Sequence, residues 1–440
     1  MRKVVNFNLL TRPSIESFMN MDTIKRIWKT KELRNSLFYI LFALTIFRVA
    51  AHITVPGINP AGLAEFLNSN QFLGLLNVFS GGTLENFSIV AMGIAPYITS
   101  SIIFQLLGMI FPQIEEMQKE ESGRQKINRW TRLATVPLAL VQGYGLISIF
   151  SQQGLGGVLG STASFDLSGF GLIVALISMT AGTIFLMLIG ELISERGVGN
   201  GISIMILAGI ISGFPTFLQQ VASTYTRDSL GDILLFVLLT LVTVVTVVII
   251  NEGQRNIPVQ YARGGAGKVM SHLPLRINMG GMIPIIFAIA IIVFPPLIAQ
   301  FFLEARTEFL RNAATFVLQL FGNGVFYGVL YFLLVFTFTF FYASVVFKPE
   351  QVAENLQKQG GFIPGIRPGE QTANYLNWVK NRILLTGAVF LGGIAVLPLI
   401  VQAFTGQQNL VVGGASILII VAVVIDMIKQ IESQITMRQY

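Results

Sequence analysis

Ten apolar stretches alternate with polar segments along this chain. Each is close to the ~20 residues that an α-helix needs to cross the hydrocarbon core of a bilayer. Six of the ten contain no Asp, Glu, Lys or Arg. The pattern therefore predicts ten membrane-spanning helices. Their approximate bounds are residues 36–53, 88–111, 133–150, 170–192, 202–222, 230–250, 281–303, 323–347, 384–403 and 412–431.

The composition agrees with this prediction. Hydrophobic residues make up 53% of the chain and charged residues 12%, and the mean hydropathy is +0.69. A typical soluble protein carries about 25% charged residues. The chain has 43 glycines, and in lipid such small residues let helix backbones approach one another closely. We therefore expect an all-α polytopic membrane protein with a packed helical bundle and no separate soluble domain between the spans.

Basic residues are concentrated on one side of the predicted topology. Most of the 29 Lys and Arg residues precede the first span or follow the second, sixth and eighth spans, whereas the other side holds only Arg227, Arg306 and Arg311. Lys and Arg near the ends of spans mark the cytoplasmic side. We therefore expect both termini in the cytoplasm and no removable signal peptide. The formal charge of +7 is then a topology signal rather than a sign of nucleic-acid binding.

The connection between the first two spans contains a short, partly apolar segment at residues 72–79, within a stretch of about 70–86. The segment is too short to cross a bilayer. It either lies on the membrane surface or re-enters the protein, because backbone at membrane depth is tolerated only where it is buried or lines a cavity. The segment consists of Phe72, Leu73, Gly74, Leu75, Leu76, Asn77, Val78 and Phe79.

Two internal matches predict a duplication of the chain. Gly93-Ile-Ala-Pro-Tyr-Ile98 resembles Gly281-Met-Ile-Pro-Ile-Ile286, and Gly201-Ile-Ser-Ile-Met-Ile206 resembles Gly414-Ala-Ser-Ile-Leu-Ile419. Both pairs lie five spans apart. Because five is odd, two halves of five spans, residues 1–223 and 224–440, would have opposite orientations around a pseudo-two-fold axis in the membrane plane.

Residues that such an axis relates can converge near the middle of the membrane. The repeat would place Ile98, Ile206, Ile286 and Ile419 around one centre. The alternative is that each isoleucine faces lipid or a neighbouring helix, as isoleucines in membrane helices commonly do.

The sequence lacks the motifs of the common enzyme classes. Residues 264–268 (Gly-Gly-Ala-Gly-Lys) superficially resemble a phosphate-binding loop, but Ala262 stands where the leading Gly is required and Val269 follows the Lys. The two histidines, His52 and His272, are far apart and do not have the spacing of metal ligands. With no cysteine there is no thiol nucleophile or disulfide. We expect no cofactor and no enzymatic activity.

An ion-coupled secondary solute transporter is the alternative function. Such proteins bind substrate or coupling ions with ionisable groups inside the membrane. Most of the candidates here lie near the ends of the predicted spans, which weakens that interpretation. The candidates are Arg48, His52, Glu191, Asp232, Asp426 and Lys429.

Six segments spread over nearly the whole chain resemble the SecY family, the central subunits of the bacterial protein-conducting channel. The last two segments are long and specific. The six are Pro56–Asn59, Phe79–Gly82, Gly93–Ile98, Glu121–Arg124, Ser194–Ser203 and Phe362–Thr372.

The resemblance implies two halves that form a clamshell around an hourglass-shaped pore, and it makes residues 72–79 part of a re-entrant plug. It also implies that signal sequences leave sideways between helices 2 and 3 on one side and helices 7 and 8 on the other. Polar residues along the second span can hold this gate closed, namely Thr99, Ser100, Ser101 and Gln105. The implied aliphatic pore ring is Ile94, Ile98, Ile202, Ile206, Ile286 and Ile419.

The same resemblance implies the partners of the chain. Energy would come from the SecA ATPase or from a translating ribosome, docking on loops 251–277 and 347–382 through Arg255, Arg263, Lys268, Arg276 and Arg367. Ribosomal RNA would be the only nucleic acid contacted. SecE and SecG subunits, preprotein signal sequences and nascent membrane proteins are the other expected partners, in the bacterial plasma membrane. Between Tyr261 and His272 the loop is shorter than in familiar members, and this is where the sequence departs from the family pattern.

Overall fold

The computed structural model describes residues 30–56, 80, 82–152, 169–196, 199–223, 230–261, 270–303, 305, 307–405 and 413–437. The described part is mainly helical, as the hydrophobic pattern predicted. The helices are α3 (Lys31–Ala50), α6 (Ala95–Ile110), α7 (Pro112–Lys119), α8 (Glu121–Gln152), α10 (Gly169–Arg196), α11 (Gly201–Ser223), α12 (Leu230–Glu252), α13 (Ile283–Phe301), α14 (Glu308–Gly322), α15 (Gly324–Val346), α16 (Pro349–Lys358), α17 (Glu370–Thr405) and α18 (Gly413–Met437).

Every predicted span falls on one of these helices. Within the described residues, four helical segments are by themselves long and apolar enough to cross a membrane, and the pair α6 and α7, bent by 114°, makes a fifth. Shorter apolar helical segments lie within α11, α12 and α13, at Gly201–Pro215, Thr240–Glu252 and Ile283–Ala299. The four long segments are Lys31–Ala50, Gly169–Arg196, Gly324–Lys358 and Glu370–Leu397.

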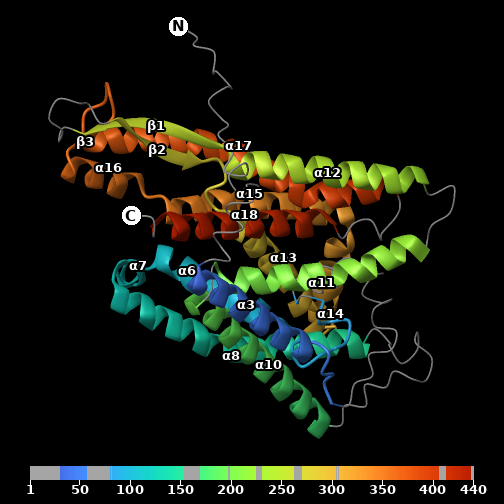
Figure 1. Ribbon diagram of the computed structural model, residues 1–440. Coiled ribbons are helices and arrows are strands. Elements are labelled where there is room, and N and C mark those ends of the chain that lie inside the picture. The colour runs from blue at the N-terminus through green and yellow to red at the C-terminus, as the bar shows by residue number, and fades with distance from the viewer. Residues whose placement is uncertain are drawn as a thin grey trace.

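The helices form two groups that follow the order of the chain. Figure 1 shows α3, α6, α8, α10 and α11 on one side and α12, α15, α17 and α18 on the other, with α13 running obliquely between them. The groups meet where α13 packs on α6 and α8 and where α11 packs on α18. One large apolar cluster includes buried residues from both groups and forms the centre of the molecule.

The first part of the second predicted span is not helical. Residues 83–94 form turns, and α6 begins only at Ala95. This backbone is buried and bonded within the protein: the amide of Ile89 donates to the carbonyl of Ile53 (2.9 Å), and the amide of Val55 donates to that of Phe87 (3.0 Å). Irregular backbone is tolerated at membrane depth only when it is satisfied in this way.

A matched pair of glycines supports the predicted internal repeat. Gly93 and Gly281 have φ angles of 57° and 59°, in the left-handed region that favours glycine. Each stands two residues before a helix, α6 or α13, and each is followed three residues later by a proline in the first turn. The backbone therefore takes the same turn at the two places where the sequence repeats.

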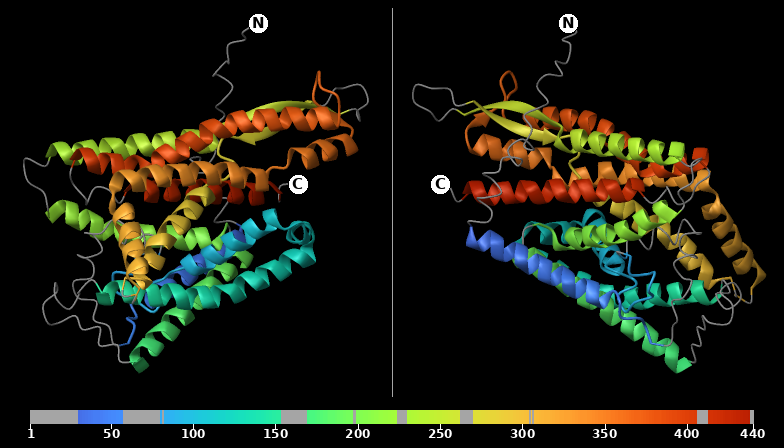
Figure 2. Two further views of the ribbon diagram at one scale, coloured as in Figure 1. Left: turned by 180° about the vertical axis from the view of Figure 1, so that it is seen from behind. Right: turned by 45° about the vertical axis from the view of Figure 1, so that its right-hand side comes forward.

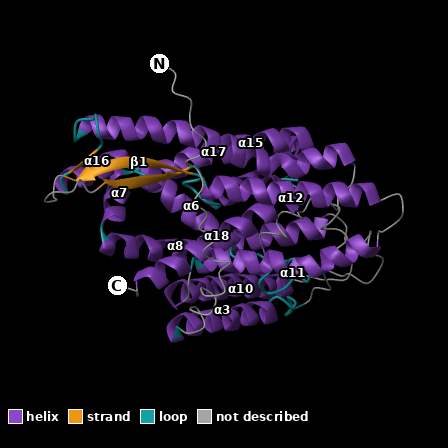
Figure 3. Cartoon of the chain, turned by 45° about the horizontal axis from the view of Figure 1, so that its top comes forward, coloured by secondary structure: helices purple, strands orange, loops and turns teal. Residues whose placement is uncertain are grey.

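The two long cytoplasmic loops of the prediction fold together into one small sheet (Figure 3). Strand β1 (Gln254–Tyr261) pairs antiparallel with β2 (Met270–Arg276), and its end pairs with β3 (Gly361–Phe362) through Gln260↔Phe362 and Tyr261↔Gly361. An apolar cluster beneath the sheet draws residues from β1, β2, α16 and α17. The hydrophobic pattern alone had left these segments as loops.

Helix α14 was not predicted either. It connects α13 to α15 at the end of the molecule away from the sheet, and Figure 2 shows it running across the direction of α12, α15 and α17. The sequence signal was present, because Glu308–Gly322 alternates apolar and polar residues with a helical period.

Candidate functional site

The six isoleucines proposed as a pore ring come together at the centre of the molecule. Five are buried in the central apolar cluster, and Ile202 is partly exposed and packs against it. They come from four helices or the residue just before one, so both groups of helices contribute. The six are Ile94 and Ile98 at α6, Ile202 and Ile206 on α11, Ile286 on α13 and Ile419 on α18.

This arrangement makes an aliphatic barrier rather than a chemical site. Isoleucine side chains offer no hydrogen bonds to water or ions, and a narrow apolar constriction can resist them by dewetting. The residues have no charge with which to hold a solute in place. An aliphatic centre of this kind therefore has the chemistry of a barrier to water and ions.

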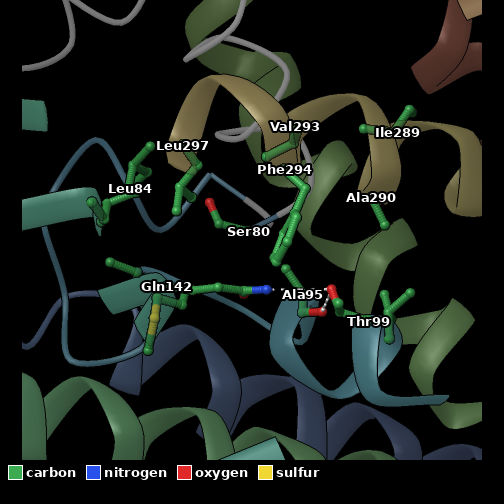
Figure 4. Close-up of a pocket in the computed structure, with 14 residues that line it drawn as sticks. Ser80, Leu84, Ala95, Thr99, Gln142, Ile289, Ala290, Val293, Phe294 and Leu297 are labelled. Atoms are coloured by element: carbon green, nitrogen blue, oxygen red, sulfur yellow. Dashed lines mark hydrogen bonds between the residues drawn. The ribbon is translucent and has the colours of Figure 1, made fainter. Parts of the chain in front are cut away.

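A cavity of about 50 Å³ lies beside this barrier, between α6 and α8 on one wall and α13 on the other. Figure 4 shows that the two walls differ: Gln142 of α8 reaches toward Thr99 of α6, whereas the α13 wall presents apolar side chains. The Gln142 amide donates to the Thr99 hydroxyl (3.4 Å), which itself donates to the carbonyl of Ala95 (3.0 Å). The α13 residues are Ile289, Ala290, Val293, Phe294 and Leu297.

The four polar residues proposed for a lateral gate bond on the α6 and α8 side of this cavity. The Ser100 hydroxyl donates to the carbonyl of Thr131 on α8 (2.8 Å), and the Gln105 amide donates to the Ser101 hydroxyl within α6 (3.1 Å). Of the hydrogen bonds described for this set, those from Ser100 to Thr131 and from Gln142 to Thr99 tie α6 to α8, and the others stay within α6. Gln142 was missed by sequence reasoning, although a lone amide in an otherwise apolar span is a usable signal.

The proposed plug, Phe72 to Phe79, lies outside the described residues. The chain that follows it lies at the cavity, because Ser80 and Leu84 line the wall. Thr83 is fully buried, and its hydroxyl lies 2.9 Å from the carbonyls of both Ser80 and Val90. These contacts place Ser80, the first described residue after the proposed plug, next to the barrier.

The basic residues proposed for docking divide between described and undescribed positions. Arg255 and Arg276 are exposed on the paired strands β1 and β2, and Arg367 is exposed on the turn before α17. Gly365 and Gly369, both with positive φ, bracket that turn, and the Thr372 hydroxyl donates to the carbonyl of Arg367 (2.9 Å). Arg263 and Lys268 lie outside the described residues.

An ion pair links the two groups of helices near the sheet. Lys348, between α15 and α16, lies 2.9 Å from Glu115 of α7. The two residues are far apart in the sequence and both partly exposed, so no local pattern could have paired them. The contact joins α7, which follows α6, to the start of α16.

Several of the ionisable residues considered for a solute transporter have structural partners. Glu191 pairs with Arg132 (2.7 Å), and Lys429 pairs with Glu252 (2.8 Å). His52 lies with its Nδ1 atom 2.8 Å from the carbonyl of Arg48. Asp426 and Lys429 line a polar cavity of about 220 Å³ near the sheet, together with Arg276 and Asn278.

Comparison with known proteins identifies the family. The sequence model of SecY matches residues 88–428. The chain belongs to the SecY family. It is 42% identical to the protein translocase subunit SecY of Pseudomonas aeruginosa over 427 residues, which cover 93% of this chain and 92% of that protein. It is 40% identical to the protein of that name from Streptomyces coelicolor over 431 residues, which cover 94% and 98%.

Solved structures share the fold of this SecY family member. A structure described as "The structure of a protein conducting channel" matches with a TM-score of 0.61 and 18% identity, over 90% of this chain and 91% of that one. Sec61 in a canine ribosome-channel complex matches with a TM-score of 0.60 and 17% identity, over the same shares. The family resemblance and the membrane fold read from the sequence are both confirmed.

Proposed function

We propose that this chain is the channel-forming subunit of a protein translocase, which passes unfolded polypeptides across the membrane and releases signal or transmembrane segments into lipid. The observation that carries the proposal is the convergence of six isoleucines from four helices in a member of the SecY family. An aliphatic ring resists ions when it is closed. It also binds no particular side chain, which suits a conduit that must pass and release most sequences.

The comparisons favour this function over solute transport, because the relatives are protein translocase subunits and the related folds include protein-conducting channels. The ion pairs Glu191–Arg132 and Lys429–Glu252 add to the argument, because charges that are held by each other are poor ligands for a coupling ion.

Lateral release would occur where α6 and α8 meet α13, with α15 completing the far side. The apolar cavity at this contact supports the assignment, because a small void between helices marks a place where the walls are held by few contacts. The Gln142–Thr99 bond stiffens one wall and leaves the other free to move away from it. The residues 72–79 would plug the pore from the side opposite the sheet.

The two halves, residues 1–223 and 224–440, would open around the isoleucine ring. A motor of the SecA type or a ribosome would dock on the sheet and the adjacent turn, through Arg255, Arg276 and Arg367. Small SecE-like and SecG-like subunits would brace the halves. The protein would lie in a bacterial plasma membrane with both termini on the cytoplasmic side, and all energy would come from the docked partner.

A single cysteine tests the conduit directly. The chain contains no cysteine, so Ile286→Cys introduces a unique thiol in the ring, which can be crosslinked to a cysteine in a stalled, half-translocated preprotein. We expect efficient crosslinking that requires the motor. Val329→Cys, on an exposed position of α15, is the matched control and should not crosslink. Productive export without a crosslink at residue 286 would place the path elsewhere, and no export with all partners supplied would refute the proposed function.

A further inference from the structure

Helix α14 has three different faces. Side chains follow one another at about 100° around an α-helix. On one face Ala314 is buried, with Val317 and Phe321 partly buried beside it. The next face is polar and exposed, and the third is apolar and exposed. The polar face consists of Glu308, Arg311, Asn312, Thr315 and Gln319, and the exposed apolar face of Phe309, Ala313 and Phe316.

The exposed apolar face is the unexplained one. Phe309 is 78% exposed and Phe316 is 64% exposed. The two residues are seven positions apart, about two turns, and therefore lie on the same side of the helix. A helix at the edge of a protein in water needs one buried face and one polar face. A third face that is apolar, between the other two, is expected where a helix lies at a boundary between hydrocarbon and water.

The direction of α14 fits such a boundary. It runs across the direction of the spans α12, α15 and α17, at the end of the molecule away from the sheet (Figures 1 and 2). Two contacts fix the angle between α14 and α15. Asn323 caps α15 by accepting from the amides of Val325 (3.0 Å) and Phe326 (3.4 Å), and the rings of Phe321 and Phe326 meet edge to face with centroids 5.7 Å apart.

The apolar face is also continuous in the chain with a surface that lipid must cover. Only Asn323 separates α14 from α15. The second residue of α15, Val325, is 78% exposed, and Val329 and Leu333, one and two turns later, are both more than half exposed. This stripe belongs to a span of mean hydropathy 2.2, so its environment is hydrocarbon. The exposed face of α14 therefore begins where the lipid-covered face of α15 ends.

We propose that α14 lies in the interfacial layer of the leaflet opposite the cytoplasmic sheet, with the rings of Phe309 and Phe316 among the upper parts of the acyl chains. Arg311 and Gln319 point toward water. The occupant of the apolar face is thus the lipid surface itself. Because α14 directly follows α13, which lines the cavity beside the barrier, this contact anchors the outer end of that helix to the leaflet. The proposal depends on the membrane fold and not on the transport function.

Spin labelling tests the proposal on the full chain. The chain has no cysteine, so Phe309→Cys and Phe316→Cys each give a single nitroxide label, in vesicles of phosphatidylethanolamine and phosphatidylglycerol. Gln319→Cys on the polar face and Val329→Cys on α15 are the matched controls. We expect the ratio of collisions with oxygen to collisions with a water-soluble nickel chelate to be several times higher at residues 309 and 316 than at 319. Their ratio should approach that at 329.

Two outcomes would overturn the proposal. Labels at 309 and 316 that collide with the nickel chelate as often as the label at 319 would mean that this face is in water. Labels that collide with neither reagent would mean that protein covers it, either the plug segment, a small subunit or a second copy. Because both phenylalanines are largely exposed, their replacement removes little packing. Unchanged thermal unfolding of each variant shows that the fold is intact without reference to export activity. Quenching of the fluorescence of Phe316→Trp by brominated lipid repeats the test without a spin label.

Discussion

At the scale of single residues, the centre of this protein is defined by what its side chains lack. Ile286 and Ile419 are almost completely buried, and the proposed pore ring to which they belong contains only aliphatic groups. Its closure therefore relies on packing and on the exclusion of water rather than on directed bonds. A polar group introduced there has no hydrogen-bond partner in the protein, so water enters the cluster to solvate it.

We expect Ile286→Asn to make vesicles that contain the protein leak small ions, because a buried amide without a partner recruits water into the constriction. It should also lower the free energy of unfolding by about 1–3 kcal/mol. Ile286→Val is the control: it keeps the aliphatic surface, should cost about 0.5–1.5 kcal/mol and should not leak. Equal ion flux through both variants, measured by release of an entrapped fluorescent ion indicator, would contradict a seal at this level.

Ser100 provides a residue-scale test of the α6–α8 contact. Its hydroxyl is fully buried and donates to the Thr131 carbonyl, which also accepts from the Thr135 hydroxyl (2.8 Å). Ser100→Ala should therefore lower the free energy of unfolding by only about 0.6 kcal/mol, the average for hydrogen bonds between membrane helices. The measurement is equilibrium unfolding in detergent micelles. Ser101→Ala is the control, because the described hydrogen bond of Ser101, from Gln105, stays within α6. If Ser100→Ala lowers the free energy of unfolding no more than Ser101→Ala does, the contact between Ser100 and Thr131 does not stabilise the fold.

At the scale of helices and strands, the sequence predicted the elements well and their limits less well. All ten apolar stretches lie on helices, because a long apolar run in this composition has few alternatives. Residues 88–94 were wrongly included in a helix, since hydropathy cannot distinguish buried turns from helical residues. The β1–β2 hairpin was missed because the loops were not searched for strand patterns, and the pairing of β1 with residues 361–362, about a hundred positions away, is a tertiary contact that no local pattern records. Helix α14 was not predicted because only apolar runs long enough to cross a bilayer were sought.

The ion pair between α7 and the start of α16 makes a prediction at this scale. Glu115→Lys should weaken the contact between the two groups of helices near the sheet, and Lys348→Glu should do the same. The double charge swap should recover most of the loss. A double-mutant cycle on thermal unfolding should give a coupling of less than about 1 kcal/mol, because both residues are partly exposed. Strictly additive effects would show that the pair contributes nothing in solution.

The turn before α17 supports a second prediction at this scale. Arg367→Glu should abolish ATP-driven export into inverted membrane vesicles, because it reverses the charge of an exposed residue on a turn that two glycines hold in shape. Thermal unfolding should stay the same, since the side chain packs on nothing that the fold requires. Lys358→Glu, at an exposed basic residue on the neighbouring α16 that pairs with Glu354 (2.7 Å), is the control. Normal export by the Arg367 variant, or equal loss in the control, would remove Arg367 from the docking surface.

At the scale of the whole molecule, symmetry explains what sequence could and could not say about the site. Ile98, Ile206, Ile286 and Ile419 were found from an internal repeat, and they do lie in one cluster. Ile94 and Ile202 came only from the family resemblance, because their counterparts in the repeat are Met282 and Ala415 rather than isoleucines. Gln142 and the pair Glu115–Lys348 have no counterpart in the repeat. Their roles arise where the two groups of helices meet, which no local pattern records.

The sheet formed by β1, β2 and β3 has a mechanical consequence. Strand β1 follows α12 after the single residue Gly253, and β2 leads within a few residues into α13; the amide of Ile277 closes the base by donating to the carbonyl of Gly253 (2.8 Å). The pairing of β1 with β3 connects the same hairpin to α17. A force that tilts the β1–β2 hairpin therefore acts on α12, α13 and α17 together. Through α13 the same force turns one wall of the proposed conduit.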